Sequence, residues 1–136
     1  MRYLLDTNIV SHLIRGNQAV TARALAVPMM AISISSVTEG ELIYGLCKRP
    51  EAARLHRSVH AFLIRVDVLP WDRAAATRYG DLRAQLERQG RSLGPLDMMI
   101  AAHALSTDSS LATNDRAFGA VPGLAIEDWT ATHQPR

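Results

Sequence analysis

Short apolar runs alternate with longer helical segments along this 136-residue sequence, and this alternation limits the fold more than any other feature. Runs of this length and composition predict β-strands, and the periodic segments between them predict helices. The predicted strands cover 2–5, 31–35, 66–70, 110–114 and a short part of 124–129. The predicted helices cover 7–16, 20–27, 36–47, 51–64, 72–89 and 95–105. Strands that alternate with helices form parallel sheets, so we expect an α/β fold: one domain over 1–136, with a mostly parallel sheet flanked by helices on both faces.

The segment "GPLDMMIAAHAL" (94–105) places one carboxylate in an almost wholly apolar helix. At helical spacing Asp97 shares a face with Ile100, Ala101 and Ala104, and a helix apolar on nearly every side is usually buried. Burial of an unpaired carboxylate costs several kcal/mol. The helix dipole favours an acid close after Pro95, but it does not explain an acid on an apolar face.

Two further acids directly follow predicted strands. Asp6 comes after 2–5 and Asp115 comes after "SLAT". Ligands of open α/β sheets bind beyond the carboxyl ends of the strands, so both acids are candidates for a site. Each acid also fits a helix N-cap or a turn, and the sequence leaves both interpretations open.

Glu39 and Glu41 require different interpretations. The segment 36–39 fits a capping box with Ser36 as the N-cap residue, which gives Glu39 a structural role. Glu41 lies about 200° further round the helix, and no cap accounts for it. Its i+4 neighbour Gly45 leaves a bare helix surface, which indicates that something packs or binds there. A solvent-facing glutamate beside a helix–helix contact is the alternative; we favour a functional Glu41.

These acids predict a metal site. We expect Asp97 to face Asp6 and Glu41 across the end of the sheet. Clustered carboxylates raise one another's pKa, and a divalent cation removes that repulsion. Oxygen ligands alone favour Mg²⁺ or Mn²⁺, ions that suit phosphodiester hydrolysis.

The composition is consistent with this chemistry and excludes other classes. Fourteen of the fifteen basic residues are arginine, which binds phosphate well, although a GC-rich genome would produce the same preference. The single cysteine, Cys47, excludes an internal disulfide and fits a reducing cytosol. No segment has the length of a signal peptide or a membrane span, so we expect a soluble cytoplasmic protein. The sequence contains no P-loop, GxGxxG or CxxC motif.

Four blocks in order resemble the PIN-domain ribonucleases of the VapC toxin type. They are "LLDTNIVS", "SSVTEGELIYG", "GPLDMMIAAHAL" and "LATNDRAF…VPGLAIEDW", and they run nearly from end to end of the chain. The resemblance implies Mg²⁺- or Mn²⁺-dependent endonucleolytic cleavage of RNA. It also implies inhibition by a cognate antitoxin of the VapB type, and a homodimer.

The family's acidic site falls on Asp6, Glu41, Asp97 and Asp115 of this sequence. By this resemblance Asp6 and Asp97 are the principal metal ligands, and Glu41 holds the ion or its waters. Asp115 is preferred to its neighbour because it is charged. The polar residues expected to hydrogen-bond around the acids are Thr7, Asn8, Ser35, Thr113 and Asn114.

Three other functions remain open at this point. A PIN nuclease of RNA processing would work without an antitoxin, and a neighbouring antitoxin gene would distinguish the two. An inert binding module is disfavoured because all the core acids are present. A phosphoryl-transfer receiver or phosphatase needs a lysine that supports its aspartate, and Lys48 follows no predicted strand.

Overall fold

The computed structural model describes residues 1–131, so the last part of the predicted domain, 132–136, lies outside the described residues. The strands are β1 (Tyr3–Leu5), β2 (Ile32–Ser35), β3 (Asp67–Leu69), β4 (Ser110–Ala112) and β5 (Ile126–Glu127). The α-helices are α1 (Thr7–Ile14), α2 (Gln18–Ala26), α3 (Ser36–Cys47), α4 (Ala53–Arg65), α5 (Arg73–Arg88) and α6 (Pro95–Ser106). Two short 3₁₀ helices that the sequence did not predict are η1 (Met29–Ala31) and η2 (Arg116–Ala120). The predicted α/β fold is confirmed.

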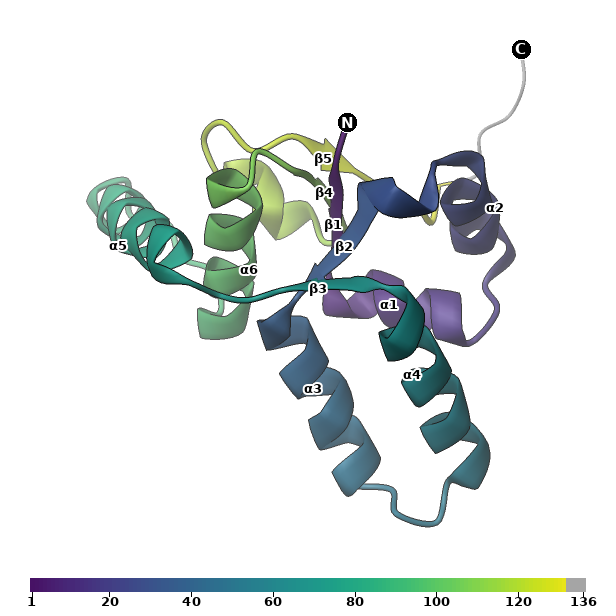
Figure 1. Cartoon of the computed structure of the whole chain (residues 1–136). Coiled ribbons are helices and arrows are strands. Elements are labelled where there is room, and N and C mark those ends of the chain that lie inside the picture. The colour runs from purple at the N-terminus through teal and green to yellow at the C-terminus, as the bar shows by residue number, and fades with distance from the viewer. Residues whose placement is uncertain (132–136) are drawn as a thin grey trace.

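The five strands form one sheet in the order β3-β2-β1-β4-β5, and every pair is parallel (Figure 1). In the centre, Leu4 is paired with Ser33 of β2 and with Leu111 of β4. The chain builds outward from β1 in one direction through β2 and β3, and then returns to add β4 and β5 on the other side. The order therefore reverses between β1 and β4, and such a reversal opens a crevice at the carboxyl ends of the two strands.

Local signals explain most helix boundaries. Asp6 caps α1, Asn17 caps α2 and Asp72 caps α5, each through a side-chain oxygen that accepts a backbone N–H. Gly16 and Gly90 follow α1 and α5 with φ of 80° and 67°, a conformation that favours glycine after a helix.

The capping box predicted for α3 is wrong. Ser35, not Ser36, is the N-cap residue, and its hydroxyl accepts the Val37 N–H at 3.1 Å. The Ser36 hydroxyl instead accepts the backbone N–H of Trp71 at 3.0 Å, from the segment that follows β3. Glu39 therefore lies one position beyond the capping-box site, and its predicted structural role has no support.

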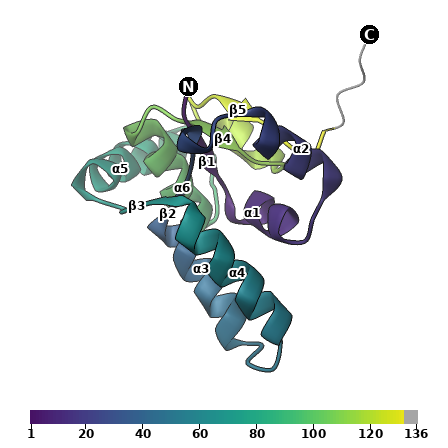
Figure 2. The same ribbon diagram turned by 45° about the vertical axis from the view of Figure 1, so that its right-hand side comes forward.

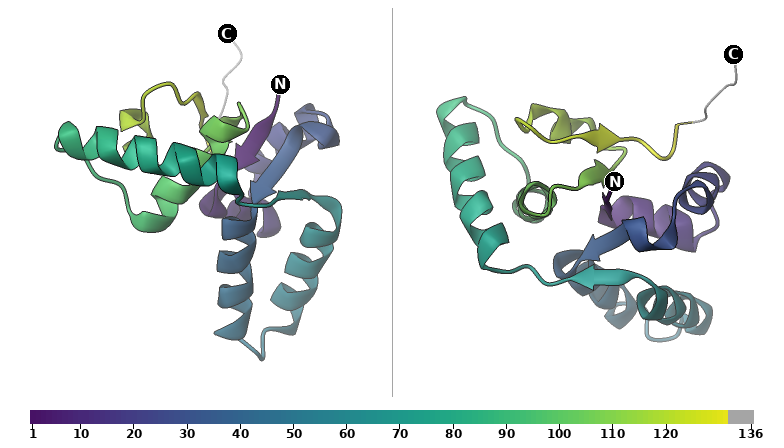
Figure 3. Two further views of the ribbon diagram at one scale, coloured as in Figure 1. Left: turned by 60° about the vertical axis from the view of Figure 1, so that its left-hand side comes forward. Right: turned by 45° about the horizontal axis from the view of Figure 1, so that its top comes forward.

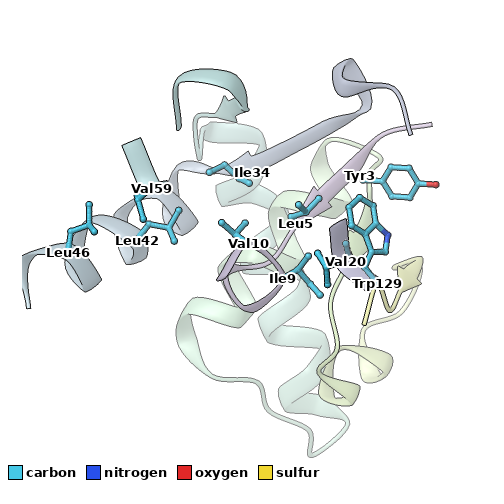
Figure 4. Close-up of a cluster of buried hydrophobic side chains, with 11 residues drawn as sticks. Tyr3, Leu5, Ile9, Val10, Val20, Ile34, Leu42, Leu46, Val59 and Trp129 are labelled. Atoms are coloured by element: carbon cyan, nitrogen blue, oxygen red, sulfur yellow. The ribbon is translucent and has the colours of Figure 1, made fainter. Parts of the chain in front are cut away.

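Helices cover both faces of the sheet because alternate strand residues point to opposite sides. Tyr3 and Leu5 contribute to a core with residues of α1, α2, α3 and α4, and Trp129 packs edge-on against the Tyr3 ring in the same core (Figure 4). Leu4 and Leu111 belong to the other core, with α5, α6 and η2. Figure 3 shows α5 as the outer helix of the α5–α6 pair.

Helices α3 and α4 run side by side and project from the sheet as a hairpin (Figure 2). Cys47, at the tip end of α3, is exposed. None of the helices in residues 1–131 combines the length and apolar character that a membrane span requires.

Candidate active site

Asp6 occupies the central position at the carboxyl end of β1. Its side chain is only 4% exposed, and its Oδ1 accepts the Ile9 N–H at 2.9 Å, so the cap of α1 holds the carboxylate in place. Burial raises the pKa of Asp6 above its ordinary value, and hydrogen bonds from the Thr113 side chain and the Ile9 N–H lower it only in part. The charges of Asp97 and Asp115 raise this pKa further, which shows that three acids share one electrostatic environment.

Asp115 enters the same environment from the neighbouring strand β4. Its backbone N–H donates to the Thr113 hydroxyl at 3.1 Å, and its Oδ1 accepts the Ala117 N–H at 2.9 Å as the cap of η2. Asn114 is exposed, and in the part of the chain that the structure describes its side chain makes no recorded hydrogen bond. The charge of Asp115 contributes to the raised pKa of Asp6 and of Asp97.

Asp97 lies in the first turn of α6, directly after Pro95. Its side chain is half-buried, and burial is the main cause that raises its pKa. The charges of Asp115 and Glu41 raise the pKa further. Asp97 is therefore electrostatically linked to Asp115, which follows β4, and to Glu41 on α3.

Glu41 is held by a residue of another helix. Its Oε1 accepts a hydrogen bond from the Thr7 hydroxyl at 2.7 Å, and the Thr7 Oγ1 also lies 3.2 Å from that of Thr38. Because Thr7 directly follows Asp6, the start of α1 positions both acids. The sequence predicted that something packs or binds beside Gly45, and within the described chain a Cβ added there would meet nothing within 4 Å.

The remaining polar candidates behave differently. Thr7 and Thr113 contact site acids, as described. Asn8 is exposed, without a recorded side-chain hydrogen bond among residues 1–131. Ser35 is fully buried, but its hydroxyl lies 2.8 Å from Nδ1 of His103 rather than against a carboxylate.

His103 is a residue whose structural importance the sequence did not reveal. It is buried on α6, and its bond to Ser35 joins that helix to the N-terminus of α3. Burial lowers its pKa, and the Asp72 charge opposes this only in part. Its partner Ser35 is distant in the chain, so no local sequence pattern indicates this bond.

Within the described residues, none of the four site acids forms an ion pair with a cationic side chain. The ion pairs within residues 1–131 are Arg23–Glu127 and Arg83–Glu87, so neither involves a site acid. Asp6 and Asp97 are buried or half-buried carboxylates with raised pKa, and two further acids lie beside them. A divalent cation bound there would relieve the repulsion between these carboxylates. The oxygen-only donor set therefore fits such an ion.

The four acids do not close around one point. Among the described His, Cys, Asp and Glu side chains, no three converge as a set that could hold a metal ion. Hard divalent ions keep several of their waters, so one or two direct carboxylate ligands are sufficient. The other acids would then contact the waters of such an ion.

A five-stranded parallel sheet with acids at its reversal point defines an α/β domain with an acidic site, and the comparison with known families identifies its family. The PIN domain family matches residues 3–124, so the chain belongs to this family. Nucleases of the PIN family generally depend on a divalent metal ion.

Within that family the chain is similar to VapC proteins. It is 43% identical to the tRNA(fMet)-specific endonuclease VapC of Shigella flexneri over 96% of this chain and 99% of that protein. It is 32% identical to the ribonuclease VapC2 of Rickettsia felis, over 95% and 98%. Among solved structures, a DNA-bound VapBC from Salmonella typhimurium matches with a TM-score of 0.88 and 38% identity, covering 95% of this chain and 98% of that chain.

Proposed function

We propose that this protein is a metal-dependent endoribonuclease, the toxin component of a type II toxin–antitoxin system. It hydrolyses RNA phosphodiester bonds at Asp6, Glu41, Asp97 and Asp115, with Mg²⁺ or Mn²⁺ as cofactor. The observation that carries the proposal is the shared electrostatic environment of Asp6, Asp97 and Asp115 at the sheet's reversal point, which Glu41 extends toward α3. The similarity to VapC ribonucleases supports the same reaction.

The contacts that restrain each acidic side chain indicate its role in the reaction. Asp6 and Asp97 bind the cation, and Asp6 is the more rigid of the two because the cap of α1 restrains it. When bound there, a divalent cation would polarise a phosphate oxygen and lower the pKa of a coordinated water. Glu41 presents Oε2 to the attacking water because Thr7 occupies Oε1. Asp115, whose charge raises the pKa of Asp97, would orient further waters.

The initiator tRNA is the substrate that the relatives favour. Two of them, from Shigella flexneri and Salmonella typhimurium, are named tRNA(fMet)-specific endonucleases, at 43% and 38% identity over nearly the whole chain. The carboxylate site cuts any phosphodiester bond placed in it, so selectivity for one tRNA depends on contacts outside the acids.

An antitoxin of the VapB type is the proposed partner. The structural neighbours include VapBC complexes, and this chain has an apolar groove that suits a helical segment of a partner. The groove has a volume of about 380 Å³ and lies between α2 and α4, lined by residues that include Leu25, Met29 and Phe62. Leu25 is 82% exposed and Met29 is 68% exposed, which is unfavourable without a partner.

Three further expectations belong to the same proposal. The nuclease unit comprises 1–136 as one domain. It acts in the cytoplasm, where its RNA substrates are. It forms a homodimer, which the exposed Ile43 and Tyr44 on α3 support.

The first test is cleavage of tRNA(fMet) transcribed in vitro, with elongator tRNA(Met) as the matched control. Purified antitoxin-free protein and Asp97→Asn are assayed with Mg²⁺, with Mn²⁺ and with EDTA. We expect a single cut in tRNA(fMet), only with wild type and metal. Equal cleavage of elongator tRNA(Met) would overturn the assignment of tRNA(fMet) as substrate and leave the nuclease activity in place. An absence of cuts by folded protein would overturn the nuclease and favour an inert binding module.

A further inference from the structure

A groove leads away from Glu41 along the α3–α4 hairpin. It has a volume of about 220 Å³ and is lined by residues of α1, α3 and α4. Thr7 and Glu41 lie in its wall, and so do Arg15, Lys48 and Arg49. One surface depression therefore contains both a proposed active-site acid and a group of cationic side chains.

The groove continues past the first cationic residues. A second depression of about 600 Å³ shares four lining residues with the first, Ile14, Arg15, Arg49 and Leu55. It adds Arg54 and Ser58 from the start of α4. We call the two depressions together the hairpin groove.

The hairpin groove is strongly positive apart from Glu41. Its cationic residues are all exposed, and its lining includes no acid other than Glu41. Within residues 1–131 no carboxylate lies within 4.0 Å of Arg15, Lys48, Arg49 or Arg54, since the recorded ion pairs are elsewhere. A cation at the end of a helix is stabilised by the helix dipole, which accounts for Arg15 and Lys48 but not for Arg49 or Arg54.

Gly45 keeps the groove open beside the acid. It lies one helical turn from Glu41, and a Cβ added there would meet nothing within 4 Å. Glycine inside a helix costs about 1 kcal/mol relative to alanine. No packing within the described chain compensates for this cost, so the bare surface faces whatever enters the groove.

We propose that the hairpin groove binds the RNA strand on one side of the scissile phosphate, with Arg15 and Arg49 bound to successive phosphates and Arg54 beyond them. This inference rests on the proposed function, because the groove begins at Glu41. Charge complementarity selects RNA as the occupant: a polyanion meets unpaired arginines, whose planar guanidinium groups bind phosphate oxygens in pairs. Glu41 lies at the active-site end of the groove, where a bound cation would offset its negative charge toward the strand.

Binding is tested separately from cleavage. Asp97→Asn is introduced into every protein so that none cleaves, and a fluorescein-labelled single-stranded RNA of 20 nucleotides is titrated in Mg²⁺ at several KCl concentrations. The double variant Arg15→Gln/Arg49→Gln is compared with Arg78→Gln/Arg88→Gln, which removes two exposed arginines of α5. Both pairs change the net charge equally.

We expect the groove variant to bind about tenfold more weakly. Its slope of log affinity against log salt falls by about 1.4, because each lost phosphate contact on a single strand contributes about 0.7. The α5 variant keeps the wild-type slope. In proteins with Asp97 intact, the groove variant raises KM and retains kcat at saturating RNA.

Two results would overturn the inference. One is an equal salt slope for the groove and α5 variants. The other is loss of antitoxin binding by the groove variant with RNA binding intact, which would assign the groove to the protein partner. The two proposals are tested independently. If wild type cleaves no RNA but the groove variant still loses salt-dependent RNA binding, the nuclease activity is rejected and RNA binding by the hairpin groove is supported.

Discussion

The Thr7 hydroxyl donates a 2.7 Å hydrogen bond to Oε1 of Glu41 and so connects the start of α1 with the middle of α3. Thr7 directly follows Asp6, whose carboxylate caps the same helix. The positions of two proposed active-site acids are therefore coupled through adjacent residues, although the acids lie on different elements. Such a coupling restrains Glu41 before substrate binds, and preorganisation of this kind favours catalysis.

Replacement of Thr7 tests this restraint. Thr7→Val keeps the shape and removes the hydroxyl, so Glu41 loses its partner and samples other rotamers. We expect the single-turnover cleavage rate to fall about tenfold, equivalent to about 1.4 kcal/mol in the barrier. Thr7→Ser restores the donor and should recover most of the rate. If Thr7→Val cleaves at the wild-type rate, Glu41 does not need this hydrogen bond.

Asp97→Asn separates activity from stability. The amide cannot bind the cation as the carboxylate does, so cleavage should be lost. Without divalent metal, the variant should melt at the same temperature as wild type or higher, because the substitution removes repulsion from Asp115 and Glu41. Asp81→Asn, at an exposed position on α5, is the control and should change neither property. A large loss of thermal stability in Asp97→Asn would show that Asp97 is structural.

The same variant has a defined pH signature. The folded pKa of Asp97 is raised above its ordinary value of 3.8, so the folded protein holds this proton more tightly than the unfolded chain. In metal-free protein, the contribution of Asp97 to stability is therefore lost as pH rises through 3.8 to the raised value. The stability advantage of Asp97→Asn should grow over that window and then remain constant toward pH 7. A pH-independent difference in urea unfolding would contradict the raised pKa.

Metal binding should stabilise the fold through the same acids. At a Mn²⁺ concentration 100 times the dissociation constant, linkage gives about 2.7 kcal/mol, which raises the melting temperature by several degrees. Glu41→Gln should reduce this gain. Glu39→Gln, two residues away on α3 and outside the site, should retain it. Equal gains in the two variants would remove Glu41 from the metal site.

His103 should carry a large share of the link between α3 and α6. His103→Leu keeps the volume but breaks the buried bond to Ser35, which should lower the free energy of unfolding by about 2–3 kcal/mol at pH 7.5. His60→Leu, at an exposed position on α4, should have little effect.

The difference in the free energy of unfolding between wild type and His103→Leu should become smaller at acidic pH. Burial holds the folded pKa of His103 below its ordinary value of 6.5, so the unfolded chain binds the proton first. Stability from the neutral imidazole is present above pH 6.5 and is lost as pH falls through 6.5 to the lowered value. Wild type should lose stability over that window relative to His103→Leu, and parallel curves would contradict a neutral buried imidazole.

The comparison of the two serines before α3 shows where local sequence patterns are insufficient. Ser35 and Ser36 both fit an N-cap, and the pattern with Glu39 favoured Ser36. In the structure Ser35 is the N-cap residue, because β2 extends to it. The Ser36 hydroxyl instead accepts the backbone N–H of Trp71, a residue that follows β3 in the chain. A contact between residues distant in the chain leaves no signal in the local pattern.

Ser33 and Ser35 make the same point for burial. Their alternation with isoleucine is compatible with a polar outer face, yet both are buried because α5 and α6 cover that side of the sheet. Ser33 donates to the Tyr3 carbonyl at 3.0 Å, and Ser35 is bonded to His103. Tertiary packing therefore determined that the Ser33 and Ser35 hydroxyls are buried, and each of them forms a hydrogen bond.

By itself the sequence determined the α/β alternation, nearly every element and the candidate acids Asp6, Glu41, Asp97 and Asp115. Periodicity, turn residues and an acid on an apolar helix are local signals, and local chemistry produces them wherever the segment lies. Only the tertiary structure decided that β1 and β4 are neighbours, that the charge of Asp115 acts on Asp6 and Asp97, and that unpaired arginines line a groove from Glu41. These relationships depend on strand order and helix packing, which arise when distant segments bury their apolar faces together.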